Sequence, residues 1–323
     1  MRRLSSLFAL LIALALTAGA QRVDLPTNAD SVRFAAIGDM GTGGRTQYDV
    51  AQRMAQSRQT FPFDFVIMMG DNIYGSESPS NMRKKFETPY KTLLDGGIEF
   101  YASLGNHDET NQRFYQHFNM NGKRYYTFKK GNVRFFALDS NYMDPEQLAW
   151  LERELKGSGS DWKIAYFHHP LYSSGTKHGS STELRSILEP LFVKYGVDVV
   201  FQGHEHVYER IKPQNGIHYF TEGASGKLRK GGLRKSDLTA AGFDADTSFM
   251  LVEIAGDELH FQTFSRTGKS VDLGVIHRNT AAHSAADLPA EKKEAARNTP
   301  RSKDGKPVPA TAGPARAGLP SPK

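Results

Sequence analysis

Two histidines, His204 and His206, stand two residues apart directly after an apolar run at 197–201. A short run rich in β-branched residues predicts a buried strand, so both imidazoles belong to the irregular turn that follows it. Imidazole is the commonest metal ligand among side chains and suits zinc, iron, copper or nickel. The pair therefore indicates a metal site, and two surface histidines in an ordinary loop are the alternative.

Four earlier predicted strands also end in side chains that can bind a metal. A single Gly-Asp or Asn-His pair after a strand is usually a structural turn. Five such strand ends in one chain rarely coincide by chance, so together they favour a metal site. The sequence has no cysteine, and every ligand must therefore be oxygen or imidazole nitrogen. The four additional strand ends carry Asp39, Asp71 with Tyr74, Asn106 with His107, and His168.

The number of donors indicates two ions rather than one. Two aspartates, one tyrosine, one asparagine and three histidines give seven donors, which is too many for a single ion. A carboxylate can bridge, so two ions sharing one aspartate would keep open positions for water and substrate. Two metals held about 3.5–4 Å apart form a clamp for in-line displacement at phosphorus. The residues thus point to phosphate-ester chemistry.

The elements that must position these side chains alternate between strands and helices. Gly-punctuated strand ends in β-α-β units predict an α/β sandwich with its site at the carboxyl ends of strands. Asp144 followed by proline predicts a helix start, and Asn215-Gly216 predicts a hairpin turn. The strands that carry the site are expected over 32–37, 65–69, 100–104, 164–167 and 197–201, and helices over 45–58, 81–94 and 182–195.

Five motifs in this order resemble those of the calcineurin-like metallophosphoesterases. They are Gly-Asp-x-Gly at 38–41, Gly-Asp-x-x-Tyr at 70–74, Gly-Asn-His-Asp at 105–108, x-x-x-His at 165–168 and Gly-His-x-His at 203–206. The tyrosine of the second motif resembles the purple acid phosphatase branch, and the chain length is similar to its small, tartrate-resistant-type members. The resemblance implies an α/β (α+β) fold: a four-layer α-β-β-α sandwich of two mixed sheets, with the metal site at the carboxyl ends of strands.

The resemblance also implies a role for each of these residues. Asp39, Tyr74 and His206 would bind a ferric ion, and Asp71 would bridge to a second, divalent ion of iron, zinc or manganese. The second ion would be completed by Asn106, His168 and His204. His107 and His178 would contact the phosphate and the leaving group, and His169 is the alternative to His178 as the acid for that group.

The expected activity is an acid phosphatase that hydrolyses phosphomonoesters, with metal-bound hydroxide as the nucleophile. A trivalent ion lowers the pKa of bound water further than a divalent ion does, which allows attack in mild acid. A phosphodiesterase or nucleotidase with the same dinuclear site is one alternative. A phosphate- or metal-binding protein without activity is the other. Small phosphate esters are the expected partners, and we expect a monomer.

The two ends of the chain differ from the part between them. Arg2 and Arg3, an apolar stretch at 7–16 and Ala18-Gly19-Ala20 predict a signal peptide over 1–20 that is cleaved after Ala20. The alternative is an uncleaved anchor. Residues 21–278 are expected to form the metallophosphoesterase domain. The segment 279–323 has seven prolines, eleven alanines and no aromatic residue, which predicts a disordered tail.

The same two ends account for the formal net charge of +6. The predicted signal contributes two arginines, and residues 279–323 contain eight Lys/Arg against four Asp/Glu. The remaining body is electrically balanced, so we expect no nucleic-acid partner. We also expect no membrane span in the mature form and a secreted or periplasmic location.

Overall fold

A computed structural model describes residues 22–159 and 161–278. The signal peptide predicted over 1–20 and the tail predicted over 279–323 lie outside the described residues. Thirteen strands in this part of the chain form two mixed sheets. The first sheet has the order β13 (Ser270–His277), β12 (Glu258–Ser265), β11 (Ser248–Ala255), β1 (Val32–Ile37), β2 (Phe65–Met68) and β3 (Glu99–Ala102). The second has the order β10 (Thr239–Phe243), β8 (Tyr208–Gln214), β9 (Ile217–Glu222), β7 (Val199–Gln202), β6 (Trp162–Tyr166), β5 (Val133–Ala137) and β4 (Tyr126–Lys130).

Each sheet has a parallel section that determines where the site lies. In the first sheet β1, β2 and β3 run parallel. In the second, β5, β6, β7 and β9 run parallel. Parallel strands end at the same edge of a sheet, so the loops after β1, β2 and β3 gather at one edge. The loops after β6 and β7 gather at the corresponding edge of the second sheet.

The two sheets pack face to face through a core rich in aromatic side chains. The ring of Phe34 in β1 lies edge-on to Phe135 in β5 and Phe201 in β7, at centroid distances of 5.4 and 5.9 Å. All three side chains are fully buried. These contacts join strands of different sheets, and they fix the relative position of the two edges that carry the site.

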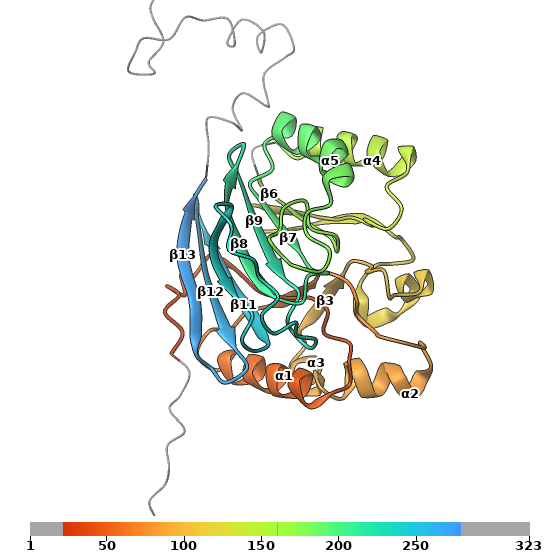
Figure 1. Cartoon of the computed structure of the whole chain (residues 1–323), viewed down its shortest axis with the longest axis vertical. Helices are drawn as coiled ribbons and strands as arrows, with labels where there is room; N and C mark the ends of the chain where they lie inside the picture. Colours follow the sequence, from red (N-terminus) through yellow and green to blue (C-terminus); the bar gives the residue numbers. More distant parts are fainter. Residues whose placement is uncertain (1–21, 160, 279–323) are drawn as a thin grey trace, which may run out of the picture.

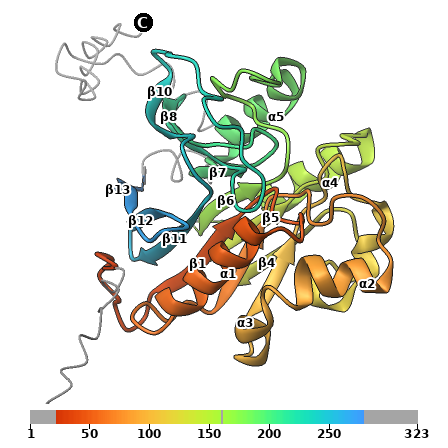
Figure 2. The ribbon, with the colours of Figure 1, turned by 60° about the horizontal axis from the view of Figure 1, so that its bottom comes forward.

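Helices cover the outer faces of both sheets, which confirms the four-layer α-β-β-α sandwich. Figures 1 and 2 show α4 and α5 on one side of the strands and α1 to α3 on the other. Leu151 of α4 and Phe192 of α5 belong to a second core cluster with Phe136 and Val200 of the second sheet. In the described ranges no helix combines the length and apolar character that crossing a bilayer requires. The helices are α1 (Arg45–Ser57), α2 (Pro79–Met82), α3 (Lys91–Asp95), α4 (Pro145–Lys156) and α5 (Thr182–Tyr195), with a π-helical turn η1 (Arg83–Glu87) and the 3-10 turns η2 (Thr110–Phe114) and η3 (Gln116–Phe118).

Two local predictions are confirmed by hydrogen bonding and backbone geometry. The side chain of Asp144 accepts the N–H of Gln147 at 2.8 Å and caps α4, with Pro145 as the first helical residue. Asn215 and Gly216 both have positive φ angles, 52° and 82°, and connect β8 to β9. A two-residue hairpin turn with this geometry matches the twist of the flanking strands.

One expectation about the elements is wrong, and one strand was not predicted. The continuous helix predicted over 81–94 is replaced by α2, the π-helical turn η1 that follows it directly, and α3. Pro89 separates η1 from α3, because proline lacks an N–H group and restricts the residue before it. The structure also contains a strand, β10, that the sequence did not indicate. It pairs antiparallel with β8 at the edge of the second sheet.

Candidate metal centre

Three of the predicted ligands sit in backbone conformations that non-glycine residues seldom adopt. Asp39, Asp71 and His204 follow β1, β2 and β7 with φ angles of 54°, 51° and 69°. The left-handed region is unfavourable for side chains with a Cβ atom, and such strain is concentrated at functional sites. The main-chain N–H of His204 donates to Asp39 Oδ2 at 2.8 Å, so the two strained turns support each other.

Glycines before these residues allow the loops to approach closely. Gly70 has a φ of 83°, and a Cβ atom there would lie 2.8 Å from Nδ1 of His168. A Cβ atom at Gly105 would lie 2.2 Å from the main-chain nitrogen of Asp71. Neither position has room for a side chain, so glycine at 70 and 105 lets the loops after β2, β3 and β6 approach one another.

A first group of three donors is formed by Asp39, Tyr74 and His206. The Tyr74 hydroxyl donates to Oδ1 of Asp39 at 3.1 Å and lies 3.2 Å from Nε2 of His206. Nε2 of His206 lies 3.3 Å from the same Asp39 oxygen. The three atoms form a nearly regular triangle, as donors facing a common ion would.

A second group surrounds Nε2 of His168. This nitrogen lies 2.9 Å from Oδ1 of Asn106 and 3.0 Å from Nδ1 of His204. Its other ring nitrogen, Nδ1, lies 2.8 Å from the carbonyl oxygen of Met69. A carbonyl only accepts, so Nδ1 carries the proton and the lone pair of Nε2 faces the group.

Asp71 lies between the two groups. Its Oδ1 is 3.4 Å from Nε2 of His168, and its carboxylate also interacts with the Tyr74 hydroxyl. The side chain is 1 % exposed, and Oδ2 has no hydrogen-bond partner within the described residues. A buried carboxylate oxygen without a partner is costly unless a cation compensates it. The ligand atoms of Asp39, Asp71 and His168 all lie within 4.8 Å of one another, which fits a cation site built from oxygen and nitrogen donors.

The pKa values of the buried acidic groups indicate that the protein alone supplies too little positive charge to balance them. Burial raises the pKa of the Tyr74 phenol far above its ordinary value, and the negative charges of Asp39 and Asp71 raise it further. Burial also raises the pKa of the Asp39 carboxyl well above its usual range, although the interaction with His168 lowers it in part. Burial and the neighbouring histidines lower the pKa of His204 to about 2, which keeps this imidazole neutral. The neutral imidazole of His204 is the form that binds a metal, whereas the phenol of Tyr74 and the carboxyl of Asp39 would release their protons when a cation binds.

All seven predicted ligands therefore lie in one place, and the other predicted histidines surround it. The His107 ring lies 4.9 Å from the Tyr74 ring, and the main-chain N–H of His107 donates to Asp71 Oδ1 at 3.0 Å. The exposed His178 ring lies 4.0 Å from the ring of His204. His169, the alternative to His178, lies 4.6 Å from the same ring.

Three further residues contact this group, and the motifs did not single them out. Glu205 is fully buried between the two histidines of the last motif, and its carboxylate accepts the N–H groups of His178 and Gly179. The position of Glu205 between the two motif histidines was the one feature of the sequence that could have identified it as part of the site. The other two residues lie in loops without any motif. Ser140 Oγ lies 2.8 Å from Nδ1 of His169, and Lys227 Nζ lies 3.9 Å from the centroid of the Tyr74 ring.

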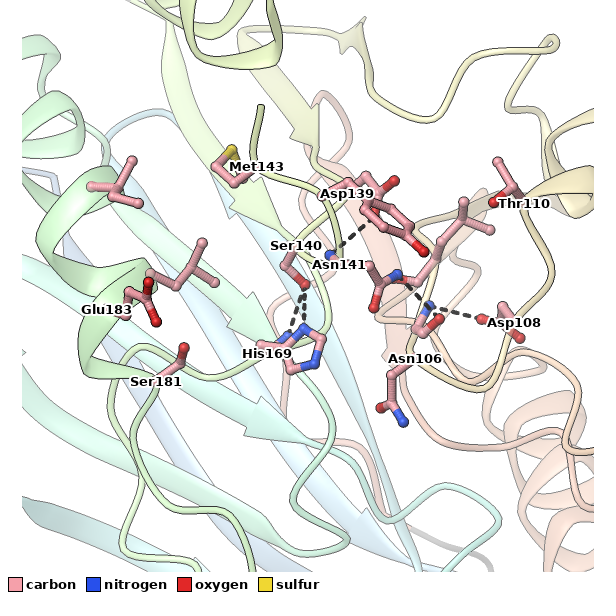
Figure 3. A pocket seen from close by; sticks show the side chains of 15 residues that line it. Asn106, Asp108, Thr110, Asp139, Ser140, Asn141, Met143, His169, Ser181 and Glu183 are labelled. Carbon is pink, nitrogen blue, oxygen red and sulfur yellow. Dashed lines mark hydrogen bonds between the residues drawn. The ribbon is translucent and has the colours of Figure 1, made fainter. Parts of the chain in front are cut away.

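A cavity of about 600 Å³ opens beside the second donor group. Figure 3 shows Asn106 and Asp108 on one side, Ser181 and Glu183 on the facing side, and the bonded pair His169 and Ser140 between them. A phosphate ester bound at the metal centre would have space here for the rest of its structure.

Comparisons with known proteins agree with this geometry. Residues 32–208 match the family model described as calcineurin-like phosphoesterase. The chain is 26 % identical over 294 residues to tartrate-resistant acid phosphatase type 5 of Rattus norvegicus, which covers 75 % of this chain and 89 % of the relative. It is 30 % identical over 253 residues to purple acid phosphatase 17 of Arabidopsis thaliana, with 66 % and 74 % covered.

Solved structures show the same fold. A purple acid phosphatase from yellow lupin (Lupinus luteus) seeds aligns with a TM-score of 0.67 and 18 % identity, over 82 % of this chain and 57 % of the lupin chain. GAP50, the anchor in the inner membrane complex of Plasmodium, also aligns with a TM-score of 0.67, at 20 % identity over 81 % of this chain and 98 % of the other.

Proposed function

The chain belongs to the calcineurin-like phosphoesterase family, and we propose that it is an acid phosphatase that cleaves phosphomonoesters with two metal ions. Hydrolysis of a phosphate ester is the chemistry of its family and of its purple and tartrate-resistant acid phosphatase relatives. One observation carries the proposal for this chain: two groups of donors that share the buried carboxylate of Asp71. A shared carboxylate is the means by which two cations are held close together.

The two groups differ in the ions that they favour. Asp39, Tyr74 and His206 would hold a ferric ion, because phenolate and carboxylate are hard anionic donors. The second group has a neutral amide and two imidazoles beside the shared carboxylate, and it suits a divalent ion of iron, zinc or manganese. When bound, such a pair of ions would activate water as a nucleophile and neutralise charge on the phosphoryl oxygens. The second group consists of Asn106, His168 and His204, with Asp71 shared.

The chain supplies the remaining proton transfer. In hydrolysis a bond forms from phosphorus to the oxygen of water, the bond to the alcohol oxygen breaks, and the alcohol takes up a proton. Three histidines without a place among the ligands lie around the centre: His107 beside Tyr74, and His169 and His178 beside His204. We assign His107 to the phosphate and His178 to the leaving group. A positioned general acid contributes about 10²–10⁴-fold to the rate.

The fold by itself does not determine activity, because one protein with this fold is described as an anchor. The alternative of a phosphate- or metal-binding protein without activity shares the fold and the metal but predicts no turnover. A phosphodiesterase or nucleotidase would use the same clamp on a different ester. The two donor groups that share Asp71, with three further histidines beside them, favour an enzyme over a binding protein without activity.

The experiment is a comparison of an aryl phosphomonoester with the matching bis-aryl diester. The purified protein with its metals should hydrolyse the monoester faster, with an optimum below neutral pH. Faster cleavage of the diester would support the phosphodiesterase alternative. No turnover of either ester by metal-loaded protein would contradict the enzymatic function.

The location and assembly form a separate part of the proposal. The N-terminal pattern supports export to a secreted or periplasmic location, with small phosphate esters as the partners of a monomeric enzyme. Mass spectrometry of the exported protein should find Gln21 as its first residue. Light scattering should give the mass of a single chain. An uncleaved N-terminus on membrane-associated protein would contradict the export part alone.

A further inference from the structure

The cavity beside the second donor group has walls from four separate segments, one of which is the loop after β6 that carries His169. The loop after β3 contributes Asn106 and Asp108, the loop after β5 contributes Ser140, and the start of α5 contributes Glu183. The cavity shares Asn106 with the donor group and includes His169, whose ring lies 4.6 Å from that of His204. A substrate whose phosphate lies at the centre would therefore direct its alcohol portion into this space.

We propose that this cavity is the leaving-group subsite, and that it selects monophosphates of uncharged polyhydroxy alcohols over substrates that carry a second phosphate on the leaving group. The inference rests on the proposed function, because it concerns the substrate of the same site.

The first argument is the charge of the walls. The residues that line the cavity include three carboxylates and neither lysine nor arginine. Asp108 is fully engaged with protein donors, since its two oxygens accept N–H groups of Gly105, Asn72 and Ile73. Asp139 is paired with Arg124 at 2.7 Å. These two carboxylates form part of the structure of the wall, and the negative charge that remains available to a ligand is that of Glu183.

Glu183 has the geometry to repel a second phosphate. Its side chain is exposed, and within the described residues it has no hydrogen bond or ion pair. It lies in the first turn of α5, whose N-terminus faces the cavity. A helix N-terminus would ordinarily attract an anion, but the carboxylate in the first turn already offsets that partial positive charge. A phosphate in the cavity would meet a like charge, and no lysine or arginine lines the cavity to balance it.

Two lysines lie beside the first donor group. Lys227 packs on the ring of Tyr74, and Lys85 Nζ donates to the carbonyl oxygen of Tyr74. Neither lysine lines the cavity. Positive charge beside the first donor group can attract the reacting phosphate.

On the side of the cavity, Arg113 and Arg124 line an adjoining pocket that shares Thr110, Tyr142 and Met143 with it. The charge of Arg124 is compensated by Asp139 and Asp144, and no lysine or arginine lines the cavity itself.

The remaining lining groups suit hydroxyls. Ser140, Ser181 and Thr110 contribute hydroxyl groups, and Glu183 contributes an acceptor. Each can exchange hydrogen bonds with an alcohol, and the apolar side chains of Leu184 and Ile187 can contact its carbon skeleton. A polyhydroxy leaving group of the size of a sugar matches these donors, acceptors and apolar surfaces.

The test compares glucose 6-phosphate with glucose 1,6-bisphosphate on the purified full chain with its metals. The two substrates differ only in the second phosphate. The wild type should prefer the monophosphate by about tenfold in kcat/KM, which corresponds to about 1.4 kcal/mol. Glu183→Lys should shift that ratio by about tenfold or more toward the bisphosphate. The dissociation constants of the matching non-hydrolysable phosphonates, measured by calorimetry, should shift in the same direction.

Asp30→Lys is the matched control. Asp30 is an exposed carboxylate in the turn before β1, at the opposite end of that strand from Asp39. The substitution makes the same change in net charge and should leave both the activity and the ratio unchanged. Equal use of the two sugar phosphates by wild type, with no effect of Glu183→Lys on the ratio, would overturn the inference while aryl monoester hydrolysis continued to support a phosphatase. Failure to hydrolyse any of these esters would overturn the proposed function and this inference with it.

Discussion

Oε1 of Glu205 accepts a hydrogen bond from the main-chain N–H of His178 at 2.5 Å, and a second from Gly179 at 2.7 Å. Glu205 thus connects the turn that carries His204 and His206 to the loop that carries His178. The same loop is held by Glu209, which accepts the hydroxyl of Ser173 at 2.8 Å. Two buried carboxylates, Glu205 in the turn after β7 and Glu209 in β8, therefore fix the position of His178 relative to the donor groups.

The first prediction follows from this link. Glu205→Ala removes the acceptor and should lower kcat by about tenfold to a hundredfold, because small displacements of a catalytic group are costly. Glu205→Gln retains a carbonyl oxygen for the two N–H groups and should recover most of kcat. Both variants should keep their metals, as determined by elemental analysis. Equal kcat in the two variants would show that the acceptor does not position His178.

The second prediction separates the histidines. His107→Ala and His178→Ala should each lower kcat/KM for an aryl monoester by about 10²–10⁴-fold while the metal content stays unchanged. The physical reason is that neither ring belongs to the donor groups, although both lie against them. If His178→Ala matches wild type across the pH range and His169→Ala does not, the leaving-group acid is His169, which Ser140 orients.

The third prediction concerns Tyr74 and the ferric ion. A phenolate bound to Fe(III) absorbs visible light by charge transfer, so the wild type should be purple or pink. Tyr74→Phe should lose this band and shift the pH optimum upward, while Asp39, Asp71 and His206 still hold a metal. The measurement is the visible spectrum with the iron content of the same sample. A colourless wild type loaded with zinc or manganese and most active in alkali would contradict the ferric assignment.

The fourth prediction concerns stability in acid and a residue remote from the site. Burial, with the charge of Arg210 adding to it, lowers the pKa of His218 in β9 below its ordinary value. The unfolded chain binds a proton at this residue as the pH falls below about 6.5, whereas the folded protein does so only at lower pH. His218 therefore contributes stability above that pH, and the contribution is lost as the pH falls toward the folded pKa.

His218→Gln should remove this dependence. The free energy of unfolding in urea, measured at pH 7 and pH 5, should fall less in the variant than in wild type. A single group can change the slope by at most about 1.4 kcal/mol per pH unit. An equal change in the free energy of unfolding between pH 7 and pH 5 in wild type and His218→Gln would show that His218 has the same pKa in the folded and the unfolded chain.

Four of the five strand ends that carry the site could be predicted because each combines a glycine with a polar residue after an apolar run, and the fifth places His168 directly after an apolar run. Asp39, Asp71 and His204 follow such glycines, and steric exclusion of a Cβ atom explains why glycine stands there. The strand β10 could not be predicted in this way. Its sequence, Thr239–Phe243, alternates between partly buried and exposed residues and lacks an apolar face, and it forms by pairing with the edge of β8.

Contacts between loops could not be predicted from the sequence either. Ser140 and His169 are 29 residues apart, and Glu205 and His178 are 27 apart, in loops that no periodic pattern constrains. The helix expected over 81–94 is interrupted at Pro89. This proline is visible in the sequence, but the spacing of the apolar residues around it favoured a continuous helix. The charge of the cavity depends on three segments meeting and appears only in the folded structure.

The most direct test of the dinuclear site is elemental analysis of wild type and Asp71→Asn, with turnover of an aryl monoester measured on the same samples. Asp71 lies between the two donor groups, and a neutral amide cannot bridge two cations. The wild type should contain close to two metal ions per chain, at least one of them iron. The variant should lose most of both ions and its activity. An Asp71→Asn protein that retains both ions and near-normal turnover would contradict the shared-carboxylate centre on which the proposed function rests.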